Sequence, residues 1–101
     1  MSQEQELSVY EELTELLEHI VENLVDYPEK VEITGNESKT SFIFEIQVQE
    51  DEYGKVIGKE GRIARSIRTL MQATSSKYGK RCLVEVLDSK SPSRQKGNRA
   101  Y

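Results

Sequence analysis

Apolar residues recur every three or four positions between Val9 and Val25, and acidic side chains fill most of the positions between them. The apolar positions are Val9, Leu13, Leu16, Leu17, Ile20, Val21, Leu24 and Val25. This spacing places them on one stripe of a helix of about five turns. Pro28 closes the pattern, because the residue before a proline is disfavoured in helical geometry. We therefore predict a long amphipathic helix that ends near Tyr27.

Two segments with apolar residues at alternate positions follow the first helix, and such alternation is typical of strands with one buried face. The first covers residues 31–34 and the second covers residues 42–48, and the turn-forming residues 35–38 lie between them. Asp51 then stands where it can cap a short helix over residues 53–57. The pattern predicts a strand, a turn, a longer strand and a short helix.

Helical spacing returns after Gly61 and continues to about Tyr78, where Gly79 is expected to stop the helix in a left-handed conformation. The apolar members of this helix are Ile63, Ile67, Leu70 and Met71, and the arginines on its other side are Arg62, Arg65 and Arg68. Alternation over residues 82–87 predicts a last strand. Residues 89–101 contain few apolar groups, so we expect a disordered basic tail.

The predicted element order is helix, strand, strand, short helix, long helix, strand. This order favours an α+β fold, in which a three-stranded mixed sheet is covered on one face by helices. The last two strands flank a helical crossover, so we expect them to be parallel. One domain over residues 1–88 and a tail over residues 89–101 account for the chain.

Charge is divided unevenly between the two halves of the chain. Residues 1–52 contain 15 acidic and 2 basic residues, a net charge of -13, whereas residues 53–101 contain 3 acidic and 12 basic residues, a net charge of +9. The two sum to the net charge of -4 for the whole chain. A basic face for a polyanion and an acidic face elsewhere fit this division, and two solvated faces without a partner are the alternative.

Several classes of protein are disfavoured by what the chain contains. The one cysteine, Cys82, and the one histidine, His19, cannot form an internal disulfide, a zinc cluster or a catalytic triad. No segment approaches the roughly 20 apolar residues of a membrane span, and the polar, acidic start differs from a signal segment. We therefore expect a cytoplasmic protein that is not an enzyme, needs no cofactor and binds no membrane.

Gly58 and Gly61 bracket a tight turn between two helical segments. Glycine allows a sharp turn and lets a phosphodiester chain approach the backbone, and the N–H groups that open the next helix favour an anion. Lys59, Arg62 and Arg65 add positive charge nearby. The apolar residues expected to form a floor for bases are Val56, Ile57, Ile63 and Ile67.

This loop and the element order together resemble the KH family of RNA-binding domains, in the bacterial arrangement called type II. The segment over residues 51–68, in a chain that is nearly all one domain, resembles the small bacterial KhpA proteins. The resemblance implies binding of single-stranded RNA without catalysis, as an RNA chaperone or post-transcriptional regulator. It also implies a homodimer, or a heteromer with a larger KH protein known as KhpB, Jag or EloR.

Carried over to this sequence, the resemblance makes residues 58–61 a phosphate clamp. The predicted RNA-binding residues are Val56, Ile57, Gly58, Lys59, Glu60, Gly61, Arg62, Ile63, Arg65 and Ile67. Ala64 stands where many KH domains carry a larger aliphatic residue, which predicts a shallower groove or a subunit contact. The alternative function is a dimerisation module with incidental RNA binding, because the same apolar helix face serves either role.

Overall fold

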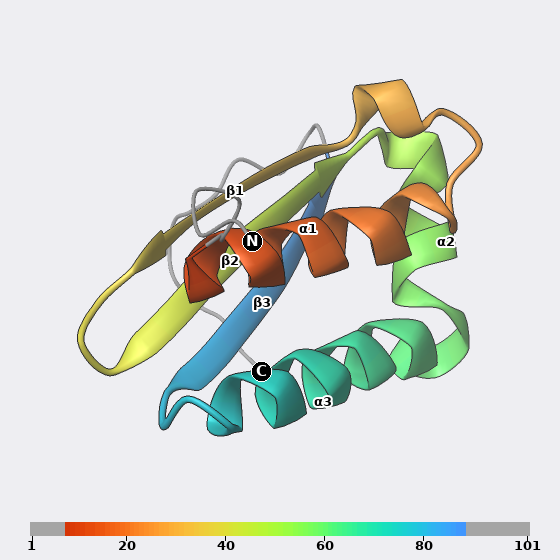
Figure 1. Ribbon diagram of the computed structural model, residues 1–101. Helices are drawn as coiled ribbons and strands as arrows, with labels where there is room; N and C mark the ends of the chain where they lie inside the picture. Colours follow the sequence, from red (N-terminus) through yellow and green to blue (C-terminus); the bar gives the residue numbers. More distant parts are fainter. Residues whose placement is uncertain (1–7, 89–101) are drawn as a thin grey trace.

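Helix α1 (Val9–Glu22) begins at Ser8, in a computed structural model that describes residues 8–88 (Figure 1). The Ser8 hydroxyl accepts the backbone N–H of Glu11, and the Glu11 carboxylate accepts that of Ser8, each over 3.1 Å. This capping box satisfies donors that the first turn of a helix leaves without a partner. The predicted start of the helix is confirmed, whereas the predicted tail lies outside the described residues.

The end of α1 comes earlier than the predicted Tyr27. Asn23 occupies the C-cap position, and its Nδ2 donates to the carbonyl oxygen of His19 over 2.7 Å. A side chain that bonds the backbone in this way competes with continuation of the helix. Val25 still packs into the core, so the apolar pattern extends past the helix that it predicted.

Three strands form the sheet, in the order β1 (Glu32–Glu37), β2 (Ser41–Val48), β3 (Arg81–Asp88). β1 pairs with β2 in antiparallel fashion, and β2 pairs with β3 in parallel. Figure 1 shows α1 and α3 on the same side of this sheet. The predicted α+β fold with a three-stranded mixed sheet and a parallel last pair is confirmed.

β1 continues through residues that the sequence analysis assigned to a turn. A Cβ atom on Gly35 would lie 2.8 Å from Cδ1 of Phe44 and 3.0 Å from the hydroxyl oxygen of Tyr10. The Tyr10 ring stacks on the Phe44 ring with centroids 5.6 Å apart. Gly35 therefore serves close packing inside a strand, and the turn lies at Ser38, whose hydroxyl accepts the backbone N–H of Ser41.

The predicted cap at Asp51 is wrong. Asp51 lies inside a 3-10 helix (Glu50–Glu52), and helix α2 (Tyr53–Ile57) has Glu52 at its N-cap position, without a side-chain hydrogen bond to the helix. The Glu52 carboxylate is instead 2% exposed and accepts the backbone N–H groups of Asp26 at 2.8 Å and Tyr27 at 3.1 Å. This buried carboxylate ties the loop after α1 to the start of α2.

Helix α3 (Arg62–Ser76) ends in the predicted manner. Gly79 has a φ of +77°, which is the left-handed conformation that glycine adopts without strain. The backbone N–H of Lys80 reaches back to the carbonyl oxygen of Ser75 over 3.3 Å, which closes the end of the helix before β3 begins.

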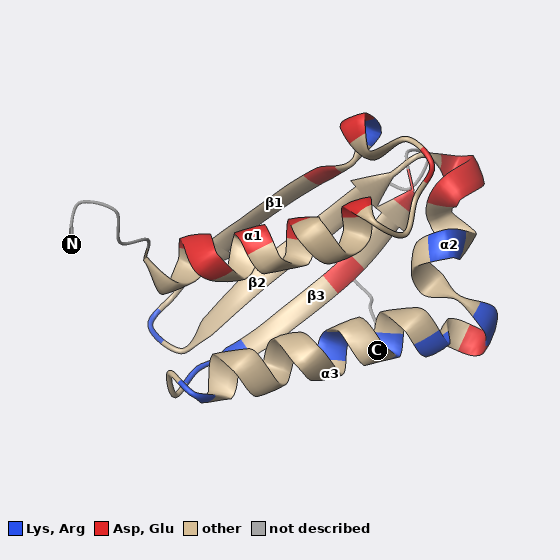
Figure 2. Ribbon diagram, turned by 45° about the vertical axis from the view of Figure 1, so that its right-hand side comes forward, with Lys and Arg blue, Asp and Glu red and all other residues tan. Residues whose placement is uncertain are grey.

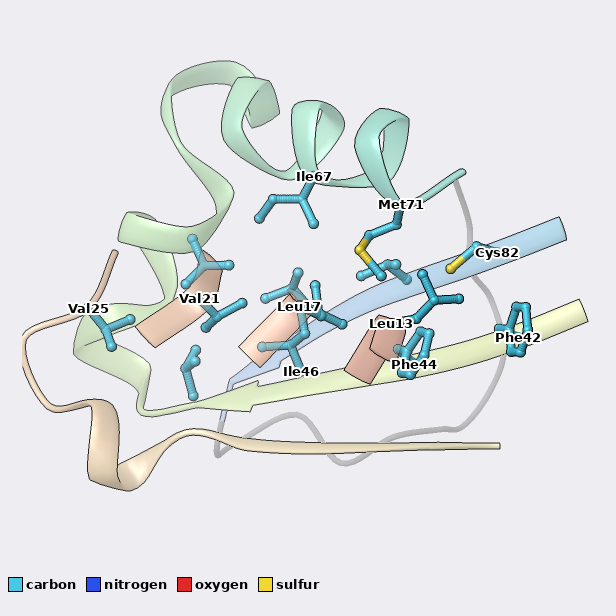
Figure 3. Close-up of a cluster of buried hydrophobic side chains, with 14 residues drawn as sticks. Leu13, Leu17, Val21, Val25, Phe42, Phe44, Ile46, Ile67, Met71 and Cys82 are labelled. Carbon is cyan, nitrogen blue, oxygen red and sulfur yellow. The ribbon is translucent and has the colours of Figure 1, made fainter. Parts of the chain in front are cut away.

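The core fills the space between the sheet and the helices (Figure 3). Its buried residues include Leu13, Leu17 and Val21 from α1, Phe42, Phe44 and Ile46 from β2, Ile67 and Met71 from α3, and Cys82 from β3. Alternate residues of β2 are buried and partly exposed, as expected for a sheet with one covered face. Among the described residues, no helix has the length and apolar character needed to cross a membrane.

Candidate nucleic-acid interface

The loop Gly58–Gly61 joins α2 to α3 at one end of the helical layer (Figure 1). Three of its residues have a positive φ: Gly58 at +79°, Glu60 at +58° and Gly61 at +75°. A Cβ atom on Gly58 would lie 2.5 Å from Cγ1 of Ile63, so this position excludes any side chain by contact as well as by backbone conformation. The loop therefore presents backbone close to its surface.

The two central residues of the loop, Lys59 and Glu60, are exposed. An Nη atom of Arg62 lies 3.3 Å from the Glu60 carboxylate, and an Nη of Arg65 donates to the Glu60 carbonyl oxygen over 3.1 Å. Within residues 8–88 no salt bridge engages Lys59. An exposed pair such as Arg62 with Glu60 stabilises little, so these cations can rearrange toward an incoming phosphate.

The N-terminal end of α3 opens directly onto this loop. Its N-cap is Gly61, which has no side chain to cap the first turn, and the N–H of Arg62 donates to the carbonyl oxygen of Lys59. N–H groups at the start of a helix carry partial positive charge and bind anions well. The loop and the end of α3 thus offer backbone donors and side-chain cations at one place.

The four apolar residues predicted to line the site separate into two pairs. Ile57 and Ile63 are partly exposed beside the loop, whereas Val56 and Ile67 are buried in the core. In this structure Val56 and Ile67 belong to the core, and Ile57 and Ile63 are the members of this set that reach the surface. Ala64 also faces the core, at 3% exposed, which argues against both the shallower groove and the subunit contact.

A shallow groove of about 480 Å³ continues from the loop along α3, and we call it the α3 groove. Its lining residues are Arg65, Arg68, Thr69, Gln72, Ala73 and Cys82. The sequence analysis placed Arg65 at the site but missed Thr69, Gln72 and Ala73. These residues follow Arg62 and Arg65 at helical spacing, and this was the signal that could have found them.

The α3 groove borders the outer edge of β3, where two side chains of α3 bond the backbone. Nε of Arg68 donates to the carbonyl oxygen of Val84 over 3.0 Å, and Oε1 of Gln72 accepts the N–H of Cys82 over 3.0 Å. Strand edges expose backbone donors and acceptors that pair readily with another chain. The side chains of Arg68 and Gln72 therefore already satisfy these two groups of the strand edge.

Cys82 lies in the core. Burial raises the pKa of its thiol to about 11. The thiol therefore stays protonated at neutral pH, and a protonated thiol is a poor nucleophile. Cys82 contributes shape to the groove rather than chemistry.

Basic and acidic side chains occupy different parts of the helical layer (Figure 2). Lysines and arginines gather along α3 and its loop, whereas acidic residues follow α1 and the 3-10 helix before α2. Lys55 of α2 belongs to the acidic side, because Nζ lies 3.0 Å from the Asp26 carboxylate and this hydrogen bond raises the pKa of Lys55. The division seen in the sequence is therefore also a division in space.

The element order α1-β1-β2-α2-α3-β3, with a glycine-bracketed loop between α2 and α3, defines a KH domain of type II. Residues 14–86 match the sequence model of the family described as "KhpA/KhpB, KH domain". The chain belongs to this family.

Relatives of known name cover most of this chain. The RNA-binding protein KhpA of Listeria monocytogenes is 45% identical over 76 residues, which span 75% of this chain and 100% of that protein. The RNA-binding protein KhpA of Aquifex aeolicus is 42% identical over 76 residues, or 75% of this chain and 96% of that protein. All or nearly all of each of these short relatives is thus matched by this chain.

Solved structures of Era contain the same fold. Aquifex aeolicus Era bound to GDP and aluminium fluoride aligns with a TM-score of 0.60 at 14% identity, over 82% of this chain and 32% of that one. Era in complex with nucleotides of 16S ribosomal RNA aligns with a TM-score of 0.58 at 16% identity, over 87% of this chain and 34% of that one. At this identity the likeness concerns the fold.

Proposed function

We propose that this protein binds single-stranded RNA at the loop Gly58–Gly61 and along the α3 groove, without catalysis. Its role would be that of a cytoplasmic RNA chaperone or post-transcriptional regulator. The observation that carries the proposal is the loop itself, whose positive φ values bring backbone to the surface beside exposed Lys59 and an uncapped helix start. The relatives, which are named RNA-binding proteins, support it.

The geometry supports a division of roles within the site. A phosphate fits the loop, where exposed Lys59 and the positive end of the α3 dipole meet it. Bases fit the partly exposed Ile57 and Ile63 and continue into the α3 groove, which Arg65 and Gln72 line. Contacts of this kind fix the path of the strand but read little sequence, so we infer broad specificity.

A function restricted to dimerisation, with RNA binding incidental, is the weaker of the two hypotheses. It gives no reason for a loop whose glycines leave backbone exposed beside cations. The names of the relatives also favour RNA as the ligand. Pairing of subunits is therefore compatible with RNA binding.

The proposal predicts that affinity for RNA depends steeply on salt. If about three or four cations among Lys59, Arg62, Arg65 and Arg68 meet phosphates, the logarithm of affinity should fall against the logarithm of salt concentration with a slope of about -2 to -3. The measurement is a polarisation titration on one single-stranded RNA, in a full-length variant whose tail cations Lys90, Arg94, Lys96 and Arg99 are replaced by serine.

A duplex of matched length serves as the control in this titration. The single strand should bind more tightly than the duplex, because the hydrogen-bonding edges of its bases are not occupied by base pairing. Binding that is unaffected by salt contradicts the phosphate contacts. A preference for the duplex contradicts the groove.

We further propose that the protein forms a homodimer through its helical layer, and that the same surface serves a heteromer with a larger KH protein. Leu16 of α1 is 37% exposed and Leu70 of α3 is 55% exposed, on two helices that cover one face of the sheet. Closed two-fold pairing is the commonest way to cover such a surface. Light scattering at micromolar concentration should give about twice the monomer mass of 11.6 kDa.

Two matched substitutions locate the proposed dimer interface. Leu70→Glu should give the monomer mass, because it places a charge in the contact. Leu83→Glu, at an exposed leucine on the other face of the sheet, should leave the dimer intact. A monomer mass for the unmodified protein would overturn the proposal. A monomer mass for Leu83→Glu alone would show that the interface lies on the sheet and not on the helical layer.

A further inference from the structure

The face of the sheet that points away from the helices carries a cluster of carboxylates. Glu45 of β2 and Glu85 of β3 are neighbours in the parallel register, and Glu32 of β1 lies opposite Gln47 in the next row. Within residues 8–88 no salt bridge engages any of the three glutamates. Like charges on neighbouring strands repel, so a cation placed among them stabilises the fold.

An apolar row lies beside these carboxylates on the same face. Ile43 and Leu83 are register partners and are 37% and 47% exposed. They border a hollow of about 310 Å³ that also includes Glu85 and Arg68, and Ile43 borders a second hollow of about 250 Å³ with Glu45. A surface with an apolar centre and acidic groups beside it can bind a peptide that carries basic side chains together with an apolar or aromatic residue.

The chain itself supplies such a peptide. Residues 89–101 contain Lys90, Arg94, Lys96 and Arg99, have no acidic residue and close with Tyr101. They begin directly after Asp88, the last residue of β3, which lies three residues after Glu85. The segment therefore starts at the end of the sheet that carries Glu32, Glu45 and Glu85. Thirteen residues reach about 43–47 Å when extended, whereas β3 spans about 26 Å. The segment can therefore cover the whole face.

We propose that residues 89–101 dock on this face of the sheet, with their basic side chains against Glu32, Glu45 and Glu85 and their apolar end over Ile43 and Leu83. Docking holds four cations on the face opposite the helices. RNA at the proposed site competes for these cations, so the acidic face lowers the affinity for RNA. This second step rests on the proposed function, whereas docking itself does not.

Backbone amide NMR without RNA tests the docking. Spectra of the full-length protein are compared with those of the variant in which the four tail cations are serine. Shifts are expected at Ile43, Glu45, Leu83 and Glu85, and they should shrink in the unmodified protein at high salt, because exposed charges are screened. Unchanged signals on this face overturn the proposal, as does a shift confined to the acidic face of α1.

RNA titrations at low salt test the competition. Glu45→Gln together with Glu85→Gln should raise affinity about three- to tenfold, because the tail is released from a competing site. The pair should have no effect in the serine-tail variant. As a matched control, Glu15→Gln together with Glu22→Gln removes two exposed carboxylates of α1 and should change affinity much less.

Two results would contradict the competition. Equal gains in affinity from both glutamine pairs would point to a general charge effect. A gain that persists in the serine-tail variant would show that Glu45 and Glu85 affect RNA binding independently of the tail. If no variant binds RNA, the proposed function fails, and the NMR comparison still decides whether the tail docks.

Discussion

Replacing Lys59 and Glu60 together by aspartate is expected to abolish RNA binding while the domain stays folded. Lys59→Asp reverses one charge at the tip of the loop, and Glu60→Asp keeps its charge in a left-handed conformation that aspartate tolerates better than glutamate. Both side chains are exposed, so no core contact is lost. Attraction to a phosphate becomes repulsion, which should weaken affinity about a hundredfold or more at low salt.

The matched control for this loop variant is Lys39→Asp. It makes the same change of charge at an exposed position in the turn between β1 and β2, at the opposite end of the molecule from the loop (Figure 1). Thermal unfolding of both variants should match that of the unmodified protein. Equal losses in the two variants would reduce the effect to overall charge, and unchanged binding in the loop variant would exclude the loop as the site.

Elements whose signals are local were predicted well from the sequence. Helical periodicity and a glycine at each end suffice for α3, and Gly79 adopts the positive φ expected of a helix stop. The errors arise where the local structure depends on contacts with residues far away in the sequence. Gly35 looks like a turn residue until Tyr10 and Phe44 are seen packing against it, and the end of α1 is decided by Asn23 and by the contact with Glu52.

The candidate site also has a part that the sequence predicts locally and a part that depends on contacts between distant segments. The loop residues are contiguous, so one stretch of sequence contains the whole motif. The α3 groove needs both α3 and the edge of β3, and its member Gln72 gives no sign in the sequence that it bonds Cys82. Val56 and Ile67 were assigned to the ligand surface because periodicity identifies an apolar stripe but does not say which part of the stripe is covered.

Glu52→Ala is expected to destabilise the domain by about 3–6 kcal/mol, because a hydrogen bond to a charged group contributes about 1.5–3 kcal/mol and two are lost. The carboxylate accepts the N–H groups of Asp26 and Tyr27 at a site that is 2% exposed. Alanine leaves both donors without an acceptor. For a domain of this size, where 1 kcal/mol corresponds to about 4–8 °C, the loss should lower the unfolding temperature by at least about 12 °C. Urea unfolding followed by circular dichroism measures the free energy of unfolding.

Asp51→Ala is the matched control, because it removes a neighbouring carboxylate that is exposed. The sequence pattern favoured Asp51 as the cap of α2, whereas the structure gives the buried contacts to Glu52, so the two variants separate these assignments. Asp51→Ala should change stability by less than about 0.5 kcal/mol, as surface substitutions do. Glu52→Gln should fall between the two, since its amide retains one acceptor oxygen. A larger loss for Asp51→Ala than for Glu52→Ala would overturn the assignment, and equal small losses would show that the buried contact contributes little net stability.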